Sequence, residues 1–227
     1  MFKIDMHVHT SESSLCGKST AEEMVKAYKA KGFDAIAITD HFVNGSTRVS
    51  KDLPWEERIH LLFEGYRRAE ECGKKIGIKV FLGFVYPDKG SDFLVYGITE
   101  EFLCNHPETE KMDIVKLLAL FRENGGFVIH AHPIRNKNNG IHLYPRSVDA
   151  IEVYNGGHGL KYGKYDPKDN DLAKFYADQT DLPQTGASDT HDVNHMYGGG
   201  MVFEREPNDI HDLIDMIRSK NFAITED

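Results

Sequence analysis

The sequence predicts an α/β fold of the barrel type, in which a ring of mostly parallel strands is surrounded by helices. Two observations lead to this prediction. Short apolar strands alternate with amphipathic helices along the chain, and metal-capable side chains recur where strands end. Alternating strands and helices form parallel sheets through crossover connections. The 227 residues suit one such domain, and no linker divides them, so we expect a single domain over residues 1–227.

The expected strands are short apolar runs bounded by polar residues, glycine or proline. They fall at residues 2–8, 34–39, 78–85, 92–98, 127–130, 148–154, 183–187 and 201–204. The expected helices have apolar residues at three- and four-residue spacing, at 20–31, 54–72, 112–123, 167–178 and 207–219. Thr20 and Glu23 match a capping box at the start of the first helix, and Gly32 is placed to end it.

Histidine and aspartate residues gather at the ends of four of these strands. The pairs are His7 and His9, Asp40 and His41, His130 and His132, and Asp189 and His191. Side chains at positions i and i+2 of a strand share one face, so a pair with that spacing can direct two ligands to one point. Imidazole and carboxylate groups suit zinc, iron or manganese. The pattern therefore predicts a metal centre at the carboxyl ends of the strands, where α/β barrels build their active sites. A doubly wound open sheet would gather fewer strands at its crevice, which favours the barrel.

The charge and cysteine content limit the expected partners. The net charge is −9, from 27 basic and 36 acidic residues, and no Lys/Arg-rich run is present, so nucleic acid is not an expected partner. Cys16, Cys72 and Cys104 are widely spaced, which is typical of reduced thiols. With no leader-like segment and no apolar run of membrane-spanning length, we expect a cytoplasmic protein without a membrane partner. The oligomeric state stays open.

Four short motifs, taken together, resemble those of the PHP family, named for polymerase and histidinol phosphatase. They are His7-Val8-His9-Thr10, Thr39-Asp40-His41, Ala131-His132-Pro133 and Ser188-Asp189-Thr190-His191. Their order and spacing match over nearly the whole chain. The resemblance implies a distorted seven-stranded (β/α) barrel similar to a TIM barrel, with two or three divalent ions (zinc, iron or manganese) at its C-terminal face. It also implies hydrolysis of phosphoesters.

Carried over position by position, the resemblance implies ligands for three ions. They are His7, His9 and Asp189 for the first ion, His132 for the second, and His41 and His191 for the third. Asp40 is expected to support His41 as a hydrogen-bond acceptor rather than to bind metal. Asp189, His191 and His132 are the residues expected to be catalytic.

One departure from the family pattern bears directly on activity. Relatives usually carry Gly-x-Glu at the end of the third strand, where the carboxylate bridges two ions, and Val85 stands at that position here. Valine cannot bind a metal. Three interpretations remain open: a depleted site with fewer ions, a replacement carboxylate from Glu12, Asp92 or Glu152, or an inactive relative.

Three further residues have more than one interpretation. Cys16 lies near the position of a third-metal histidine in some relatives, and it is either a thiolate ligand or a small buried thiol. His106 is either the remaining ligand of the second ion or a surface histidine. His130 is expected to be a non-ligand, either a substrate contact or proton carrier in the pocket or a buried, hydrogen-bonded histidine.

The predicted chemistry is metal-assisted hydrolysis of a small-molecule phosphomonoester, of the histidinol-phosphatase kind. Arg135 follows His132-Pro133, and its planar guanidinium suits phosphate oxygens. Asn155, at a strand end, is expected to hydrogen-bond the substrate. Tyr144, Tyr154 and Tyr162 are either pocket walls or packing. Two alternatives stay open: a catalytically weakened metal-binding barrel, and a metal-dependent nuclease, which the acidic charge disfavours.

Overall fold

The computed structural model describes residues 1–135, 140–159 and 164–227. They form a nine-stranded sheet in the order β7-β6-β5-β4-β3-β2-β1-β8-β9. The strands are β1 (Phe2–Val8), β2 (Ala35–Ile38), β3 (Lys79–Asp88), β4 (Ser91–Tyr96), β5 (Phe127–Ala131), β6 (Ala150–Asn155), β7 (Gln184–Ala187), β8 (Gly200–Phe203) and β9 (Phe222–Thr225). The α-helices are α1 (Ala21–Ala30), α2 (Trp55–Leu62), α3 (Glu64–Ile76), α4 (Glu100–Cys104), α5 (Ile114–Glu123), α6 (Lys168–Ala177) and α7 (Ile210–Arg218). Short 3-10 helices are η1 (Pro107–Glu110), η3 (Gly156–His158) and η4 (Val193–His195).

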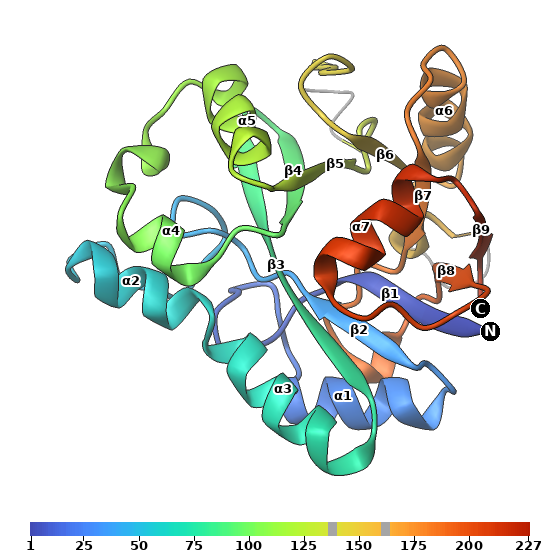
Figure 1. The fold of residues 1–227 in the computed structure, drawn as a ribbon, viewed down its shortest axis with the longest axis horizontal. Helices are drawn as coiled ribbons and strands as arrows, with labels where there is room; N and C mark the ends of the chain where they lie inside the picture. The colour runs from blue at the N-terminus through green and yellow to red at the C-terminus, as the bar shows by residue number, and fades with distance from the viewer. Residues whose placement is uncertain (136–139, 160–163) are drawn as a thin grey trace.

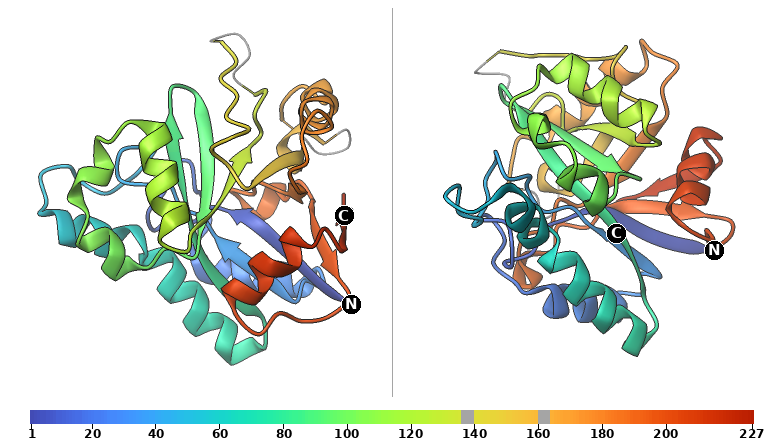
Figure 2. Two further views of the ribbon diagram at one scale, coloured as in Figure 1. Left: turned by 45° about the horizontal axis from the view of Figure 1, so that its top comes forward. Right: turned by 60° about the vertical axis from the view of Figure 1, so that its left-hand side comes forward.

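The first seven strands curl into a nearly closed barrel. Closure occurs between β1 and the end of β7, where Val8 forms a parallel bridge with Thr190 and the His9 backbone N–H donates to the Thr190 carbonyl over 3.0 Å. Figure 1 shows α1 and α3 side by side beneath β1 to β3, with α6 beside β6 and β7. In Figure 2 the orange β7 returns toward the blue β1. The predicted distorted seven-stranded barrel is confirmed, and β8 and β9 extend it antiparallel from β1.

One distortion departs from the predicted parallel sheet. β4 runs antiparallel to both β3 and β5. β3 and β4 are joined by a two-residue turn at Lys89 and Gly90, both with positive φ (45° and 85°). A connection this short forms a hairpin and cannot make the crossover that parallel strands need.

The helices agree with the sequence pattern except that one expected helix is divided in two and one short helix was not predicted. The capping box of Thr20 and Glu23 is present at the start of α1. The single helix expected over 54–72 is two helices, α2 and α3, which meet at the buried Phe63 (φ −95°, ψ 11°). The five-residue α4 and the edge strand β9 were not predicted, because both are too short to show a periodic apolar pattern.

The barrel interior is apolar except at the carboxyl ends of the strands. One cluster of buried side chains joins inward residues of β1 to β6 with Leu213, Ile214 and Ile217 of α7. A bulge in β1, where Asp5 pairs with Ile36 but Val8 pairs with Ile38, places Val8 in the outer layer beside α1. Such a bulge re-aims side chains, so His7 and His9 both point into the barrel. No helix in the described parts of the chain is long and apolar enough to cross a membrane.

Candidate metal centre

Metal-capable side chains converge at the carboxyl ends of the barrel strands in three overlapping groups. Within each group the ligand atoms lie within 4.8 Å of one another: His7, His9 and Asp189; His7, His132 and Glu152; and His9, Cys16 and His41. His7 and His9 each belong to two groups, so the groups form one continuous cluster. The donor set of imidazoles, carboxylates and one thiol fits divalent ions of the zinc, iron and manganese type.

The tightest group joins β1 to the end of β7. The Nε2 atoms of His7 and His9 are 3.1 Å apart, and they lie 3.2 and 3.3 Å from Oδ1 of Asp189. Asp189 adopts a left-handed backbone conformation (φ 61°), which is uncommon for a residue other than glycine. Below it, the buried carboxylate of Asp5 accepts hydrogen bonds from the His7 and Ser188 backbone N–H groups, and so ties the two strands together.

Glu152, on β6, supplies the carboxylate of the second group. Its Oε1 lies 3.0 Å from Nδ1 of His7, and its Oε2 accepts from the backbone N–H of His132 and from Nδ2 of Asn155, both at 2.9 Å. Glu152 was one of three replacement carboxylates considered for the position of Val85. Because alternate residues of β6 face inward, Glu152 enters the barrel without any rearrangement of the strand.

The other two replacement carboxylates have different places. Asp92 lies beside the second group, with its Oδ2 3.7 Å from Nε2 of His132. Glu12 instead accepts from the backbone N–H of Ala21 at the start of α1 and takes no part in the cluster. Val85 is fully buried among apolar side chains of the barrel interior, opposite Leu94.

His130 and His132 do not share a face, which corrects the expectation from their spacing. β5 ends at Ala131, and His132 has a positive φ of 28°, so its side chain turns toward the cluster. His130 points out of the barrel, where it stacks on Phe93 with ring centroids 5.2 Å apart. Among the described residues neither ring nitrogen of His130 has a hydrogen-bond partner, and burial lowers its pKa to about 3. The structure therefore places His130 in outer packing and not in a substrate pocket.

The third group lies at the mouth of the barrel. The His9 ring stacks on His41 and on His191, with ring centroids 4.7 and 4.4 Å apart. Cys16 is half-buried beside them. Burial, together with the charges of Asp189 and Asp40, raises the pKa of the Cys16 thiol to about 12, so the thiol keeps its proton unless a cation is near.

Asp40 supports this group indirectly. It accepts hydrogen bonds from the Thr10 backbone and hydroxyl at 2.7 and 2.6 Å and from the Ser14 hydroxyl at 2.6 Å. Ser14 Oγ in turn accepts from the backbone N–H of His41 at 3.0 Å. The expected direct contact with the His41 ring is thus replaced by a link through Ser14.

The imidazoles differ in their charge. Burial opposes protonation of His7, but the nearby charges of Asp189 and Glu152 outweigh it and raise its pKa to about 9. Burial lowers the pKa of the other imidazoles at the cluster: His9, His41, His132 and His191. These neutral rings have lone pairs available for a metal, whereas the carboxylates of Asp189 and Glu152 that raise the pKa of His7 would also attract a cation.

Arg135 and Asn155, the predicted substrate contacts, both lie beside the cluster. The Arg135 Nη2 atom is 2.6 Å from Oδ2 of Asp189 and donates to Oδ1 of Asn155 over 2.8 Å. Its Nε atom donates to Nε2 of His158 over 3.0 Å, and the guanidinium lies 4.4 Å from the centre of the Tyr165 ring. The contact with Tyr165 was not predicted, because it comes from a loop without a recognisable motif.

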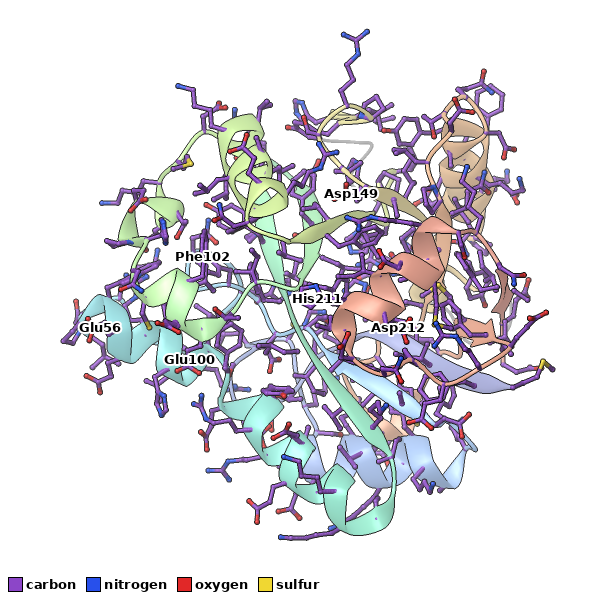
Figure 3. All side chains as sticks on the ribbon, viewed as in Figure 1. Glu56, Glu100, Phe102, Asp149, His211 and Asp212 are labelled. Carbon is purple, nitrogen blue, oxygen red and sulfur yellow. The ribbon has the colours of Figure 1, made fainter. Side chains whose placement is uncertain are left out.

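The remaining predicted residues are not brought to the cluster. The His106 ring stacks on Phe102 of α4, which Figure 3 labels, and its Nδ1 is 2.7 Å from the Phe102 carbonyl oxygen. A ligand role for His106 is therefore not supported by its position. Tyr144 packs on Phe93, Tyr154 lines a separate cavity, and Tyr162 lies outside the described residues.

A cavity of about 420 Å³ opens at the third group. It is lined by Cys16, Lys18, Lys164, Tyr165, Asp189, His191, Asp192, His195 and Tyr197. Two lysines and two tyrosines thus surround the entrance, while Asp189 and His191 form its inner wall. The size of the cavity suits a small molecule, and its two lysines are balanced by Asp189 and Asp192.

This barrel and its cluster match the class of metal-dependent proteins that the four motifs indicated. The chain belongs to the PHP family: the PHP domain model matches residues 5–142, and the PHP-associated model matches residues 167–222. A relative in Methanocaldococcus jannaschii, the uncharacterized protein MJ1587, is 24% identical over 169 residues, which cover 69% of this chain and 83% of that protein.

Two solved structures share the fold. A two-domain protein from Bacteroides vulgatus ATCC 8482, containing a predicted PHP-like metal-dependent phosphoesterase, has a TM-score of 0.71 at 20% identity. The match covers 99% of this chain and 64% of that protein, so the chain spans less than two thirds of its length. PsfC from Pseudomonas syringae PB-5123 has a TM-score of 0.64 at 17% identity, with 100% of this chain and 91% of PsfC covered.

Proposed function

We propose that this protein hydrolyses small phosphomonoesters in a reaction that depends on two or three divalent metal ions. The observation that carries the proposal is the convergence of three overlapping ligand groups beside Arg135 and a cavity of about 420 Å³. Membership of the PHP family supports the dependence on metal. The three free cysteines fit a reducing compartment such as the cytoplasm.

The residues that would hold the ions are those of the three groups, together with His191 from the cavity lining. Bound zinc, iron or manganese would supply a water molecule of lowered pKa and neutralise charge on the phosphoryl group. Asp189 anchors the cluster, because its two oxygens face His7 and His9 on one side and Arg135 on the other. We assign His191 and His132 to the ligand set on either side of Asp189.

The chain's own cations would position the substrate. Phosphoryl transfer requires orientation and charge neutralisation more than covalent chemistry. Arg135 is held by Asn155 and His158 and stacks on Tyr165, so its guanidinium has a fixed direction. Lys18 and Lys164 at the cavity entrance would attract an anionic substrate. The cavity size favours a small phosphomonoester, such as histidinol phosphate or a sugar phosphate, over a duplex nucleic acid.

The direct test removes metal with a chelator, restores zinc, iron or manganese separately, and measures phosphate release from a panel of phosphomonoesters. We expect turnover only with metal, and a fall of about 10–100-fold in kcat/KM for Arg135→Lys, which keeps the charge but loses the planar fork. His211→Ala on α7 serves as a control, because this exposed histidine belongs to none of the ligand groups.

Two outcomes would replace the proposal. Full metal occupancy without turnover on any phosphoester would indicate a weakened or inactive metal-binding barrel. Release of nucleotides from single-stranded DNA, with no reaction on small phosphomonoesters, would indicate a nuclease.

A further inference from the structure

We propose that Cys16 is a thiolate ligand that makes the third ligand group, at the mouth of the barrel, selective for zinc. The inference deepens the proposed function and rests on it, since both require a metal at the barrel mouth. It concerns the third ligand group, in which the thiol of Cys16 and nitrogens of His9 and His41 lie within 4.8 Å of one another.

The imidazoles around Cys16 have nitrogen atoms available for a metal. Nδ1 of His41 is buried and has no hydrogen-bond partner among the described residues. Nδ1 of His191 donates to the Asp189 carbonyl over 2.7 Å, which leaves the lone pair on Nε2, and this Nε2 lies 3.7 Å from the Asp189 carboxylate. His9 stacks between these two rings. Three imidazoles and one thiol are therefore gathered in one place.

The loop that carries Cys16 is held in position on both sides. The Leu15 backbone N–H donates to the Ser46 carbonyl over 2.9 Å, and the Lys18 backbone N–H donates to the His191 carbonyl over 2.8 Å. Gly17 packs so tightly that an added Cβ would lie 2.2 Å from the Thr10 carbonyl oxygen. A thiol on such a fixed loop loses little entropy when it binds an ion.

The donor chemistry distinguishes this group from the other two. Thiolate and imidazole donors are a common set for tetrahedral zinc, whereas manganese prefers oxygen donors. The other two groups contain the carboxylates of Asp189 and Glu152. These groups would accept zinc, iron or manganese. Binding of zinc at Cys16 releases the thiol proton to solvent and leaves the oxidation states of sulfur and metal unchanged.

The other two cysteines provide matched controls. Cys72 is buried on α3, in the apolar cluster that α3 shares with α1, and Cys104 is half-buried at the end of α4. In the described parts of the chain, neither belongs to a group of metal-capable side chains. Only a variant of Cys16 should therefore change metal binding.

The first experiment titrates the chelator-treated protein with Co²⁺, which replaces zinc and reports its ligands by absorption. We expect an intense thiolate-to-cobalt charge-transfer band that saturates, disappears when zinc is added, and persists in Cys104→Ser. Cys16→Ser and Cys16→His should bind Co²⁺ without this band. Cobalt binding by the unsubstituted protein without the band would overturn the inference and leave the proposed function standing, whereas no cobalt binding at all would count against both.

The second experiment measures selectivity directly. Competition with a chromogenic chelator measures the affinity for each metal. Cys16→Ser should weaken zinc binding at the third group by about 100-fold or more, because loss of a residue that only hydrogen-bonds a metal ligand costs about 10–100-fold in affinity, and loss of the ligand itself should cost more. Manganese binding should be nearly unchanged. Zinc should also protect Cys16, but not Cys104, from alkylation, as read by mass spectrometry. Equal losses of zinc and manganese affinity, or alkylation of Cys16 at the same rate with zinc bound, would contradict the assignment.

Discussion

The two halves of the metal centre are built from different chemistry. The first half, at the ends of β1, β2 and β7, holds His7, His9, His41, Asp189 and His191, and it presents closely spaced imidazoles around one carboxylate. The second half, at the ends of β3 to β6, holds Val85, Asp92, His132, Glu152 and Arg135. In it, an apolar side chain replaces the carboxylate expected from relatives, and a guanidinium lies 2.6 Å from Asp189.

The difference indicates how charge is balanced at the centre. In the second half, Arg135 places a permanent positive charge beside the Asp189 carboxylate. Without Arg135, a metal ion would have to neutralise this carboxylate. A fixed guanidinium and a divalent ion repel each other at short range. We therefore expect the first half to bind its ion more tightly, and the second half to depend on Glu152 for its ion.

The largest effect is expected from His7→Ala, because His7 belongs to ligand groups of both halves. Metal content should fall in the whole centre, and kcat/KM should fall by about 100-fold or more, since a bound ion contributes several kcal/mol of charge stabilisation. Mass spectrometry of metals in protein purified without chelator measures the first effect. His211→Ala, on α7 (Figure 3), should keep the parental metal content. Unchanged metal content in His7→Ala would contradict the assignment of His7 to either half.

Val85→Glu tests whether the two halves differ only by this carboxylate. The new side chain would enter an apolar interior beside Leu94, so we expect the metal-free variant to lose about 2–4 kcal/mol in its free energy of unfolding. Added zinc or manganese should restore much of this loss and raise metal content. Val85→Gln is the matched control, because it has the same size without the charge and should show the loss without rescue. Equal responses of both variants to metal would refute the proposed role of the missing carboxylate.

Glu152→Gln is expected to act mainly on the second half, with a smaller effect on the first through His7. The amide keeps the shape of the side chain but removes the charge next to His7 and His132, so affinity for the more weakly bound ion should fall by about 10–100-fold. Isothermal titration with manganese can resolve the two binding events. Glu12→Gln is the control, because Glu12 caps α1 outside the cluster. A loss confined to the tighter event would reverse the assignment of Glu152.

The same comparison explains how far the sequence predicts this protein. The ligands of the first half are marked by local motifs: His7 and His9 lie two positions apart at the end of β1, and Asp189 and His191 follow a strand end, although a bulge in β1 is what turns both histidines inward. The barrel itself follows from the alternation of strands and helices. Both could be predicted because each depends on residues close together in the chain.

The second half depends on contacts between distant residues and on backbone conformation. The positive φ of His132 separates it from His130, and the spacing of the two histidines gives no sign of that conformation. Glu152 joins His7 across 145 positions, so the sequence could offer it only as one of three candidates. The hairpin of β3 and β4 likewise depends on a two-residue turn that interrupts an otherwise parallel pattern.

His130→Phe gives the smallest expected effect and tests whether a histidine on β5 lies outside the centre. Burial lowers the pKa of His130 to about 3 in the folded protein, whereas an unfolded histidine has a pKa of about 6.5. Between these values only the unfolded chain binds the proton, so stability is fully present above pH 6.5 and falls by up to about 1.4 kcal/mol per unit as pH decreases toward 3. Phenylalanine fits the aromatic contacts with Phe93 and Tyr144 and has nothing to protonate, so the variant should lose less stability between pH 7 and pH 5. Urea unfolding in the presence of a chelator measures this slope without the pH dependence of metal binding, and His211→Gln should follow the parent. A parental slope in His130→Phe, or a fall in metal content, would place His130 back among the residues of the second half.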